Sequence, residues 1–470
     1  MRTNDKDTMI PTSPPRLRTI RRVRTMPPGN DSRTADLSDA TGESYGPGPV
    51  SRVHRHLVRA AAVWMGSAGG AWLAFPSLPF LATAPVALLS LRSRSIRRSA
   101  LALLLVGAAG ASREWSARPF PPGPCEGTVR LVEDPRTFGS SVSAVVSLQG
   151  RRVRAVAWGR PSYSLARMLA GETAHARGTC GPVPAPRRDR ELVAHVVGRM
   201  SLAELTGPHG DGGAVNRAAN RIRRLLTAGT RTMAHDTAAL FSGLVIGDDR
   251  EQPREMVEQF RASGLSHLCS VSGQNVVYLL AAFAPLTRRL RPLARLVATL
   301  AVIGWFVVLT RAEPSVLRAA AMATVVAVNF FRGGAMNARS VLAVSVTGLL
   351  VLDPMLARSV GFMLSAGATA GLAWLSAPLE RRGVPAVLAA TLAAQAGTLP
   401  VSLLVFHRVS LVSIVANPLA VPVAGLVMLL GIPVALVAGL VPDPVAAVLA
   451  WTMAVPTSFV AHVARVCARF

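Results

Sequence analysis

The 470-residue chain has almost no lysine: Lys6 is the only one, although Lys and Arg together number 51. A nucleotide-binding P-loop needs a Gly-Lys-Ser/Thr run, and Lys6 follows Asp5. This absence excludes transport driven by ATP hydrolysis in this chain alone. The Gly-rich dinucleotide fingerprint is also missing. The histidines of "VHRHL", His54 and His56, have no acidic partner nearby, so the sequence contains no zinc signature.

Aromatic side chains are scarce as well, at 5% of the chain, so platforms for stacking on nucleic-acid bases are few. The abundant residues are apolar side chains and arginine: the chain is 50% hydrophobic and has a formal net charge of +26. Its mean hydropathy is +0.38, and from about Leu296 onward apolar segments follow one another with little polar spacing. This composition predicts a polytopic α-helical membrane protein.

The apolar half predicts a bundle of about eight to eleven helices with broken members. Proline inside a membrane helix frees backbone carbonyls, which is tolerated where the break lines a cavity. The expected interruptions are "FAPL", "AEPSVLRA", "DPML", "TLPV" and "ANPLAVPVAG". The expected spans lie near residues 236–247 (too short for a complete span), 266–286, 293–311, 315–331, 339–352, 355–377, 384–405, 410–440 and 444–466.

Arginines flank the N-terminal apolar stretches. Residues 1–50 have no apolar period and are expected to be a disordered basic cytoplasmic tail. Residues 51–114 are expected to form N-terminal transmembrane helices, including a hairpin over 60–91 that is broken at "FPSLPF". The positive-inside rule then places the arginines on both sides of this hairpin in the cytoplasm, and the chain after Trp115 outside.

Residues 115–212 predict a small extracytoplasmic β domain. The segments "EGTVRLVED", "SVSAVVSL", "RRVRAVAW" and "ELVAHVVGR" are typical of strands, and "LQGRR" is typical of a hairpin turn. Cys125 and Cys180 bracket most of this domain, and an oxidising compartment permits a disulfide between them; two unpaired thiols are the alternative. Cys269 and Cys467 lie in apolar sequence and are expected to be buried small side chains.

Residues 213–235 predict a basic amphipathic interfacial helix, in which Arg217, Arg221, Arg224 and Arg231 recur at helical spacing. Its basic face either contacts anionic headgroups or forms a rim at the mouth of a pore.

A polar patch, "GLSHLCSVSGQN" (residues 264–275), precedes a long apolar run. An unpaired polar group in hydrocarbon costs several kcal/mol, so these side chains must face protein, water or a ligand. Polar residues also occur at other predicted bends, and polar residues within a membrane usually mark a substrate path. Glu313 is an expected exception, because it is expected to pair with Arg311 or Arg318. The polar residues of the apolar half include His267, Gln274, Asn275, Arg311, Glu313, Arg318, Asn329, Asp353, Gln395 and Asn417.

Two other classes of protein are compatible with this pattern. In an intramembrane serine hydrolase, Ser272 would be the nucleophile, but His267 and Ser272 point about 140° apart on a helix, so the base would have to come from elsewhere. A secondary transporter or a lipid-linked-substrate translocase would predict inverted internal repeats, and none is evident in the sequence.

Five segments in order resemble the characteristic blocks of the competence-type DNA-internalisation proteins, the ComEC family. They are "LFSGLVIGDD", "QFRASGLSHLCSVSGQNV", "PSVLRAAAM", "LLVLDPMLARSVGFMLSAGATAGL" and "TLPVSLLVFHRVSLVSIVANPLAVP". The β domain is similar to the external OB-like domain of that family. The resemblance implies that residues 236–470 form a channel domain that passes one DNA strand across the cytoplasmic membrane. The usual "SGLHV" appears here as "SGQNV", which removes one titratable group.

The resemblance also implies a set of functional residues and partners. Trp158 and Phe138 are available for stacking in the β domain, although a purely electrostatic guide is the more economical interpretation. No cofactor and no enzymatic activity are expected. The chain has no His-x-His-x-Asp-His run, so a separate nuclease is expected, together with an outside DNA receptor, a cytoplasmic ATPase motor and single-stranded DNA as substrate. The expected DNA path comprises His267, Ser270, Ser272, Gly273, Gln274, Asn275, Arg318, Asp353 and Asn417, and the expected DNA-guiding surface comprises Arg152, Arg154, Arg221 and Arg224.

Overall fold

The computed structural model describes residues 49–70, 94–210, 212–269, 273–407, 410 and 412–470. All of them belong to one compact unit, Gly48–Phe470. Of the predicted disordered tail, only residues 49–50 are among the described residues. The middle of the predicted hairpin, residues 71–93, lies outside them.

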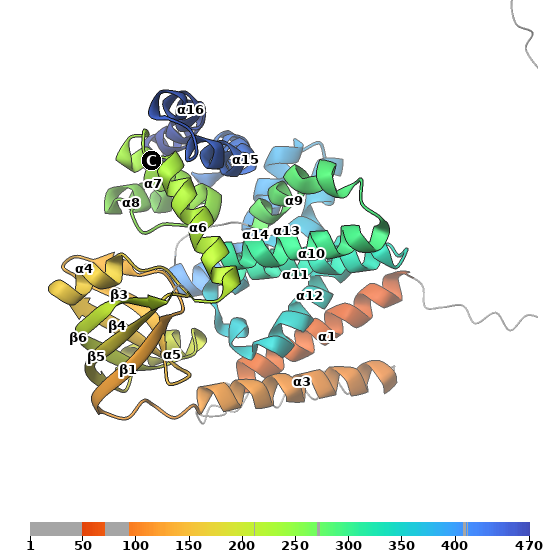
Figure 1. Ribbon diagram of the computed structural model, residues 1–470. Helices are drawn as coiled ribbons and strands as arrows, with labels where there is room; N and C mark the ends of the chain where they lie inside the picture. Colours follow the sequence, from red (N-terminus) through yellow and green to blue (C-terminus); the bar gives the residue numbers. More distant parts are fainter. Residues whose placement is uncertain (1–48, 71–93, 211, 270–272, 408–409, 411) are drawn as a thin grey trace, which may run out of the picture. The chain divides into compact units, whose positions relative to one another are not determined.

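A six-stranded sheet forms the β domain (Figure 1). Strand β1 pairs with both β3 and β5, while β4 and β6 run parallel, so the order β1-β5-β6-β4-β3 closes on itself and β2 extends it at β3. A closed barrel of five strands with this mixed pairing is the predicted OB-like fold. The strands are β1 (Gly123–Leu131), β2 (Arg136–Phe138), β3 (Ser141–Leu148), β4 (Arg151–Trp158), β5 (Thr173–Gly181) and β6 (Val196–Gly210).

Side-chain alternation explains why these strands form. In β4, Val153, Ala155 and Ala157 are buried in the barrel core, whereas Arg152 and Trp158 are exposed. The predicted fourth strand is wrong in its first half, because residues 191–193 complete helix α5 (Ala185–Val193). Proline in the first turn favours this helix start. Strand β5 was not predicted, since its glycines and polar residues weaken the alternation.

A disulfide joins Cys125 on β1 to Cys180 on β5, as predicted. The two residues are 55 positions apart in the chain. Closing a loop of this length stabilises the fold by about 4 kcal/mol, because the link restricts the unfolded chain. Cys467 is buried, and Cys269 is half-buried.

Most of the described chain is helical, and the helices gather beside the barrel (Figure 1). Among the described residues, six helices are long and apolar enough to cross a membrane: α10, α11, α13, α14, α15 and α16. Helix α12 is apolar but shorter. The protein is therefore a multi-pass membrane protein. Outside the β domain, the elements are α1 (Pro49–Gly70), α3 (Arg94–Trp115), α6 (Ala214–Gly229), α7 (His235–Ile246), α8 (Arg254–Ala262), η1 (Ser266–Leu268), α9 (Gly273–Thr287), α10 (Pro292–Leu309), α11 (Pro314–Phe331), α12 (Ala338–Leu352), η2 (Pro354–Arg358), α13 (Val360–Arg381), α14 (Ala386–Phe406), α15 (Ser413–Ala438) and α16 (Asp443–Cys467).

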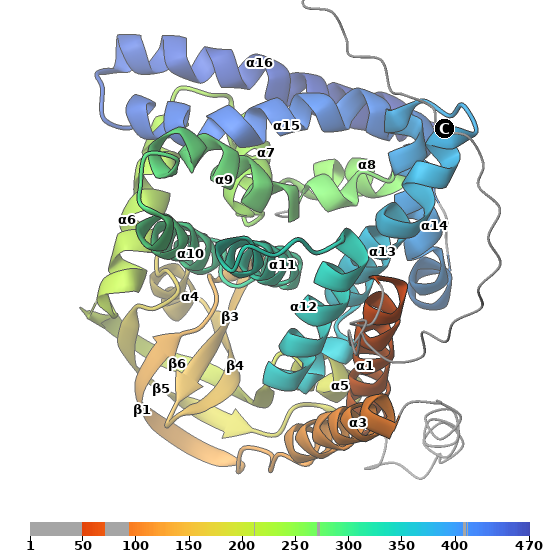
Figure 2. The ribbon, with the colours of Figure 1, turned by 90° about the vertical axis from the view of Figure 1, so that its right-hand side faces the viewer.

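The expected proline interruptions are present at two places. The chain leaves the helical path between α10 and α11, and again at Asp353, whose side chain caps η2. At the other places the helices continue: α14 contains Pro400, and α15 contains Pro418 and Pro422. In a membrane bundle, neighbouring helices and local adjustments compensate for the lost hydrogen bonds. Helices α15 and α16 lie side by side along most of their length (Figure 2).

Small residues allow α13 and α14 to approach closely. A Cβ atom placed on Gly371 would lie 1.9 Å from the carbonyl oxygen of Ala393, and one on Gly397 would lie 2.1 Å from that of Gly367. This arrangement matches the small-xxx-small packing of membrane helices. It fixes two walls of the helical bundle against each other.

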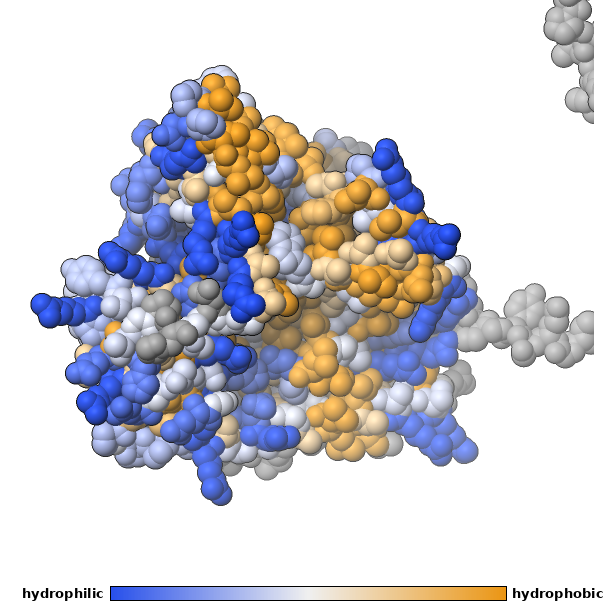
Figure 3. Space-filling model, viewed as in Figure 1, coloured by the Kyte–Doolittle hydropathy of each residue, from blue (hydrophilic) through white to orange (hydrophobic). Residues whose placement is uncertain are grey.

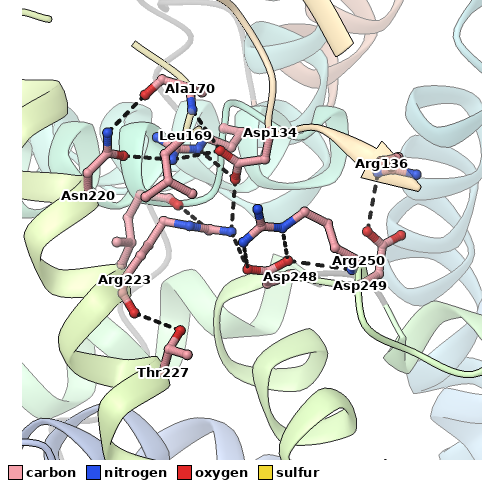
Figure 4. Close-up of polar contacts among 12 residues, drawn as sticks. Asp134, Arg136, Leu169, Ala170, Asn220, Arg223, Thr227, Asp248, Asp249 and Arg250 are labelled. Carbon is pink, nitrogen blue, oxygen red and sulfur yellow. Dashed lines mark hydrogen bonds and ion pairs between the residues drawn. The ribbon is translucent and has the colours of Figure 1, made fainter. Parts of the chain in front are cut away.

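A buried ion-pair network, here called the Asp134 cluster, ties the barrel to the helices (Figure 4). The Asp134 carboxylate lies 2.9 Å from Arg223 of α6 and accepts two hydrogen bonds from Arg311, at 3.0 and 2.9 Å. Arg223 also reaches Asp248 at 2.8 Å, and Arg250 donates twice to Asp248 at 2.7 Å. Arg311 thus pairs with Asp134, and the predicted pairing of Glu313 with Arg311 or Arg318 is not found among the described residues.

His195 makes a second connection between the barrel and the helices. Its Nδ1 lies 3.2 Å from Glu114 at the end of α3, and its Nε2 lies 3.1 Å from Asp353 before η2. Both ring nitrogens can donate to these carboxylates only when the imidazole is protonated. The hydrogen bond to Asp353 accordingly raises the pKa of His195 above its ordinary value, against the opposing effect of burial.

We expect the thermal stability of the purified protein to fall as the pH rises through this raised pKa. The stabilisation is complete below the ordinary histidine pKa of about 6.5, because the folded state retains the proton to a higher pH than the unfolded state. The His195→Gln variant should lose this pH dependence. An unchanged pH profile in that variant would contradict a role for His195 in the connection.

Candidate functional site

A cavity of about 3010 Å³ lies among the helices. Sites for small molecules usually enclose about 300–1,000 Å³, so this space exceeds what one small ligand fills. Its walls come from α8, η1, α9, α10, α11, α12, α13, α14 and α15. Figure 3 shows hydrophobic residues gathered over the helices beside a mainly hydrophilic barrel.

The cavity follows one membrane helix from end to end. Both Glu313, which caps the start of α11, and Phe331, at its end, line the cavity. Eighteen helical residues span about 27 Å, close to the roughly 30 Å thickness of a hydrocarbon core. The space is therefore long enough to extend across the apolar layer.

Arg318, in the second turn of α11, is a charged residue on this wall. Its side chain is buried, and its Nε donates to Ser365 at 2.7 Å. No ion pair with a carboxylate is found for Arg318 among the described residues. The guanidinium is thus a cation at the cavity surface, and its charge is available to an anionic ligand. Other polar residues lining the cavity are Gln274, Tyr278, Thr299, Ser365, Thr369, Thr391, Gln395, Thr398, Ser402, Ser413 and Asn417.

Gly273 leaves room for that cation. A Cβ atom at this position would lie 2.6 Å from Nη2 of Arg318 and 3.2 Å from Cβ of Ala319. A larger residue would therefore displace the guanidinium or separate α9 from α11. Glycine at the start of α9 and arginine on α11 are matched in space.

Glu313 lies at the barrel end of α11, where it also lines the cavity. Burial raises the pKa of this carboxyl.

The residues of the polar patch do not all face the cavity. His267, Gly273 and Gln274 line it, whereas Ser270 and Ser272 lie outside the described residues. Asn275 is buried, and its Nδ2 donates to the carbonyl of Leu244 at 2.8 Å. Asn275 therefore ties α9 to α7, and its contacts support a packing role behind the cavity wall.

The structure gives Gln274 and Asn275 different roles, although the sequence places both in the same polar patch. We expect Gln274→Leu to leave membrane abundance unchanged and to alter only the passage of a ligand, because Gln274 is exposed to the cavity. Asn275→Leu should lower abundance, since it removes a buried donor and leaves carbonyls unpaired. Immunoblotting of membrane fractions measures the abundance of both variants. Equal abundance of the two variants would contradict the packing role of Asn275.

Asn417 and Asp353 lie in different surroundings. Asn417 lines the cavity, and its buried Oδ1 has no hydrogen-bond partner within the described part of the chain. Asp353 does not line the cavity: one oxygen caps Met355 at 2.9 Å and the other contacts His195. Its negative charge holds the barrel connection, so the structure gives no support to a place for Asp353 on the path.

The expected guiding surface is also divided. Arg221 and Arg152 are exposed, and Arg224 is exposed beside Glu172 at 3.3 Å. Arg154 donates to both oxygens of Glu191, at 2.6 and 2.8 Å, and to Glu133 at 3.1 Å. Its charge is matched within the barrel, and these contacts do not support a guiding role.

Two cavity residues escaped the sequence interpretation. Arg261 on α8 and Arg295 on α10 line the cavity near its edges. In the sequence they look like ordinary basic residues flanking apolar helices. Their position relative to the cavity depends on how α8 and α10 pack, and no local pattern records that. In the described part of the chain, no group of three His, Cys, Asp or Glu residues could hold a metal ion.

Residues 244–470, which supply most of the cavity wall, match the model of a family described as "Competence protein". Over these residues the chain is similar to the competence protein family. The ComE operon protein 3 of Bacillus subtilis (strain 168) is 29% identical over 192 residues, which is 40% of this chain and 25% of that protein.

The uncharacterized protein YcaI of Escherichia coli (strain K12) is similar as well. It is 26% identical over 221 residues, which is 43% of this chain and 29% of that protein. The matched region thus spans less than a third of either relative. No solved structure matches this chain.

Proposed function

We propose that this protein is a membrane channel that passes single-stranded DNA into the cytoplasm during natural transformation. The cavity carries the proposal, because it combines the length of a membrane span with a buried cation and several polar side chains on a largely apolar wall. A strand carrying one charge per nucleotide needs a wet, cationic route through lipid. The similarity of residues 244–470 to the competence protein family supports the same proposal.

The distribution of arginine sets the proposed orientation. Because α10 ends and α11 begins beside the barrel, the far ends of these helices lie on the opposite side of the membrane. Hydrophilic residues also gather along the margin opposite the barrel (Figure 3). The positive-inside rule makes that side cytoplasmic and the barrel side extracytoplasmic. The loops on the far side carry Arg288, Arg289, Arg291, Arg332, Arg381 and Arg382.

The N-terminal helices fit this orientation. Arg59 donates to Ser99, and Gly66 lies against Leu104, so α1 and α3 run in the same direction. Since α3 ends at the barrel connection through Glu114, both helices begin on the side opposite the barrel. The N-terminus and its arginines are then cytoplasmic.

Passage requires contacts that are weak enough to break. Amides and hydroxyls along the wall offer donors to passing phosphates, and Arg318 lowers the electrostatic cost near the barrel end of α11. With no nucleotide-binding loop among its 470 residues, the channel needs a cytoplasmic ATPase motor or the proton-motive force. An outside DNA receptor and a separate nuclease complete the proposed pathway.

Uptake of labelled DNA by cells that lack this protein tests the function directly. We expect uptake into the cytoplasm to be lost and to return with a plasmid-borne copy. DNA bound at the cell surface serves as the control, because it should remain unchanged. Normal internalisation in the deletion strain would refute the proposed channel.

A further inference from the structure

The barrel carries a pocket of about 520 Å³ on its outer face. This volume lies within the usual range of about 300–1,000 Å³ for small-ligand sites. The pocket lies over β2, β3 and β4, where α5 and β6 border it. The lining residues that matter for its chemistry are Phe138, Ser141, Ser143, Trp158, Arg187 and Arg199.

Strand register places two aromatic rings in one row across this face. Phe138 pairs with Ser141, and Ser141 pairs with Trp158, so the three side chains point to the same side of the sheet. Two strand spacings separate the outer residues by about 10 Å. Because serine is small, it leaves a gap between rings that are 57% and 44% exposed.

A buried hydroxyl in the pocket lacks a partner. Ser143 is 7% exposed, lines the pocket, and its Oγ has no hydrogen-bond partner within the described residues. Buried polar groups are normally paired, so this hydroxyl is available to hydrogen-bond a ligand in the pocket.

The charges in the pocket favour an anionic ligand with a flat ring. Arg154 is already matched by Glu191, but no ion pair is found for Arg187 or Arg199 among the described residues. The Arg199 guanidinium lies over the Trp158 ring, 6.0 Å from its centroid. Stacking on exposed rings, combined with free guanidinium groups, is how proteins hold single strands.

We propose that this pocket binds a nucleobase of single-stranded DNA between Phe138 and Trp158, with the adjoining phosphates held by Arg187 and Arg199. The ligand is the strand of the proposed channel, so this inference rests on the proposed function. The β domain would then not guide DNA by charge alone, because this pocket binds the bases as well as the phosphates. Ser143 supplies a hydroxyl to the base edge.

The test is equilibrium binding of a fluorescent oligothymidylate to the full-length solubilised protein. An abasic oligonucleotide of equal length and charge is the second probe. Phe138→Ala/Trp158→Ala should weaken oligothymidylate binding by about tenfold or more and leave abasic binding unchanged, because only bases stack. Tyr163→Ala is the matched control, since Tyr163 is a 74% exposed aromatic residue of the same domain outside the pocket.

Charge is tested separately. Arg199→Gln should lower the slope of log affinity against log salt by about 0.7, as expected for one lost phosphate contact with a single strand. Arg130→Gln on β1, which is exposed outside the pocket, should not show the same loss of base-dependent affinity. Peptide mapping of the Cys125–Cys180 link checks that each variant barrel is folded.

Two results would overturn the proposed pocket. In the first, the double variant binds oligothymidylate as tightly as the wild-type protein does. In the second, the wild-type protein binds the abasic strand as tightly as it binds oligothymidylate. Either result combined with lost uptake in the deletion strain would leave the channel in place. Conversely, base-dependent binding together with normal uptake in that strain would support the pocket and refute the channel.

Discussion

Replacing Arg318 by glutamine is expected to reduce DNA entry by about tenfold or more while leaving membrane abundance intact. A charge-assisted hydrogen bond contributes about 1.5–3 kcal/mol, and 1.4 kcal/mol corresponds to about a factor of ten. Glutamine keeps a donor near Ser365 but removes the positive charge from the cavity wall. DNA entry is measured as nuclease-protected label, normalised to the amount of protein in the membrane.

The matched control is Arg289→Gln. Arg289 is exposed in the α9–α10 loop and does not line the cavity, so its loss changes the net charge equally without altering the cavity wall. Gly273→Ala provides a second approach, since its Cβ would displace the Arg318 guanidinium. Normal entry in both Arg318→Gln and Gly273→Ala, at normal abundance, would remove Arg318 from the DNA path.

The strands and helices that follow a regular pattern were largely predictable. Strands β3 and β4 occupy residues 141–148 and 151–158 as expected, because apolar and polar side chains alternate along them. The apolar runs likewise predicted the positions of α10 through α16 closely. Proline gave a poorer signal, since α15 contains three prolines and remains one helix.

The sequence shows that a polar residue within an apolar segment needs a partner, but it does not identify that partner. Asn275, Asp353 and Arg318 all stood out as polar positions in apolar sequence. The structure gives Asn275 a backbone carbonyl and Asp353 a histidine from the barrel, whereas Arg318 faces the cavity. These differences depend on contacts between segments far apart in the chain, which local patterning does not encode.

The same limit explains why Arg223 was overlooked. The helical pattern of α6 drew attention to its exposed arginines, Arg221 and Arg224. Arg223 lies between them, yet its side chain is only 4% exposed and contacts Asp134 and Asp248 from two other parts of the chain. Its importance appears only when the barrel and the helices are placed together.

Replacing Asp134 by asparagine is expected to destabilise the protein by about 3–5 kcal/mol, the cost of breaking a buried ion pair. The substitution preserves shape but leaves Arg311, which is 11% exposed, without its carboxylate, and it leaves Arg223, which is 4% exposed, with Asp248 alone. Arg311 and Ala312 also hold positive φ angles of 60° and 55°, an unfavourable backbone that the contacts to Asp134 stabilise. Thermal unfolding of the solubilised protein measures the loss.

Acid should have a similar effect on the wild-type protein. Burial tends to raise the pKa of Asp248, but hydrogen bonding to Arg250 and the charge of Arg223 lower it to about 2. Burial also tends to raise the pKa of Asp134, but the positive charges of Arg223 and Arg311 outweigh this effect, and the pKa is lowered. The stabilisation is therefore complete above the ordinary aspartate pKa and is lost as the pH falls through the lowered values.

Asp443→Asn is the matched control for Asp134→Asn. Asp443 pairs with Arg231 at 2.7 Å, but its side chain is 78% exposed, and exposed pairs contribute about 1 kcal/mol or less. Limited proteolysis should cut the Asp134→Asn variant faster around residues 211–213, where the chain passes from the barrel to α6. Equal unfolding temperatures for the two variants would mean that the Asp134 cluster does not hold the barrel to the helices, and the connection would then depend on His195 and on apolar packing.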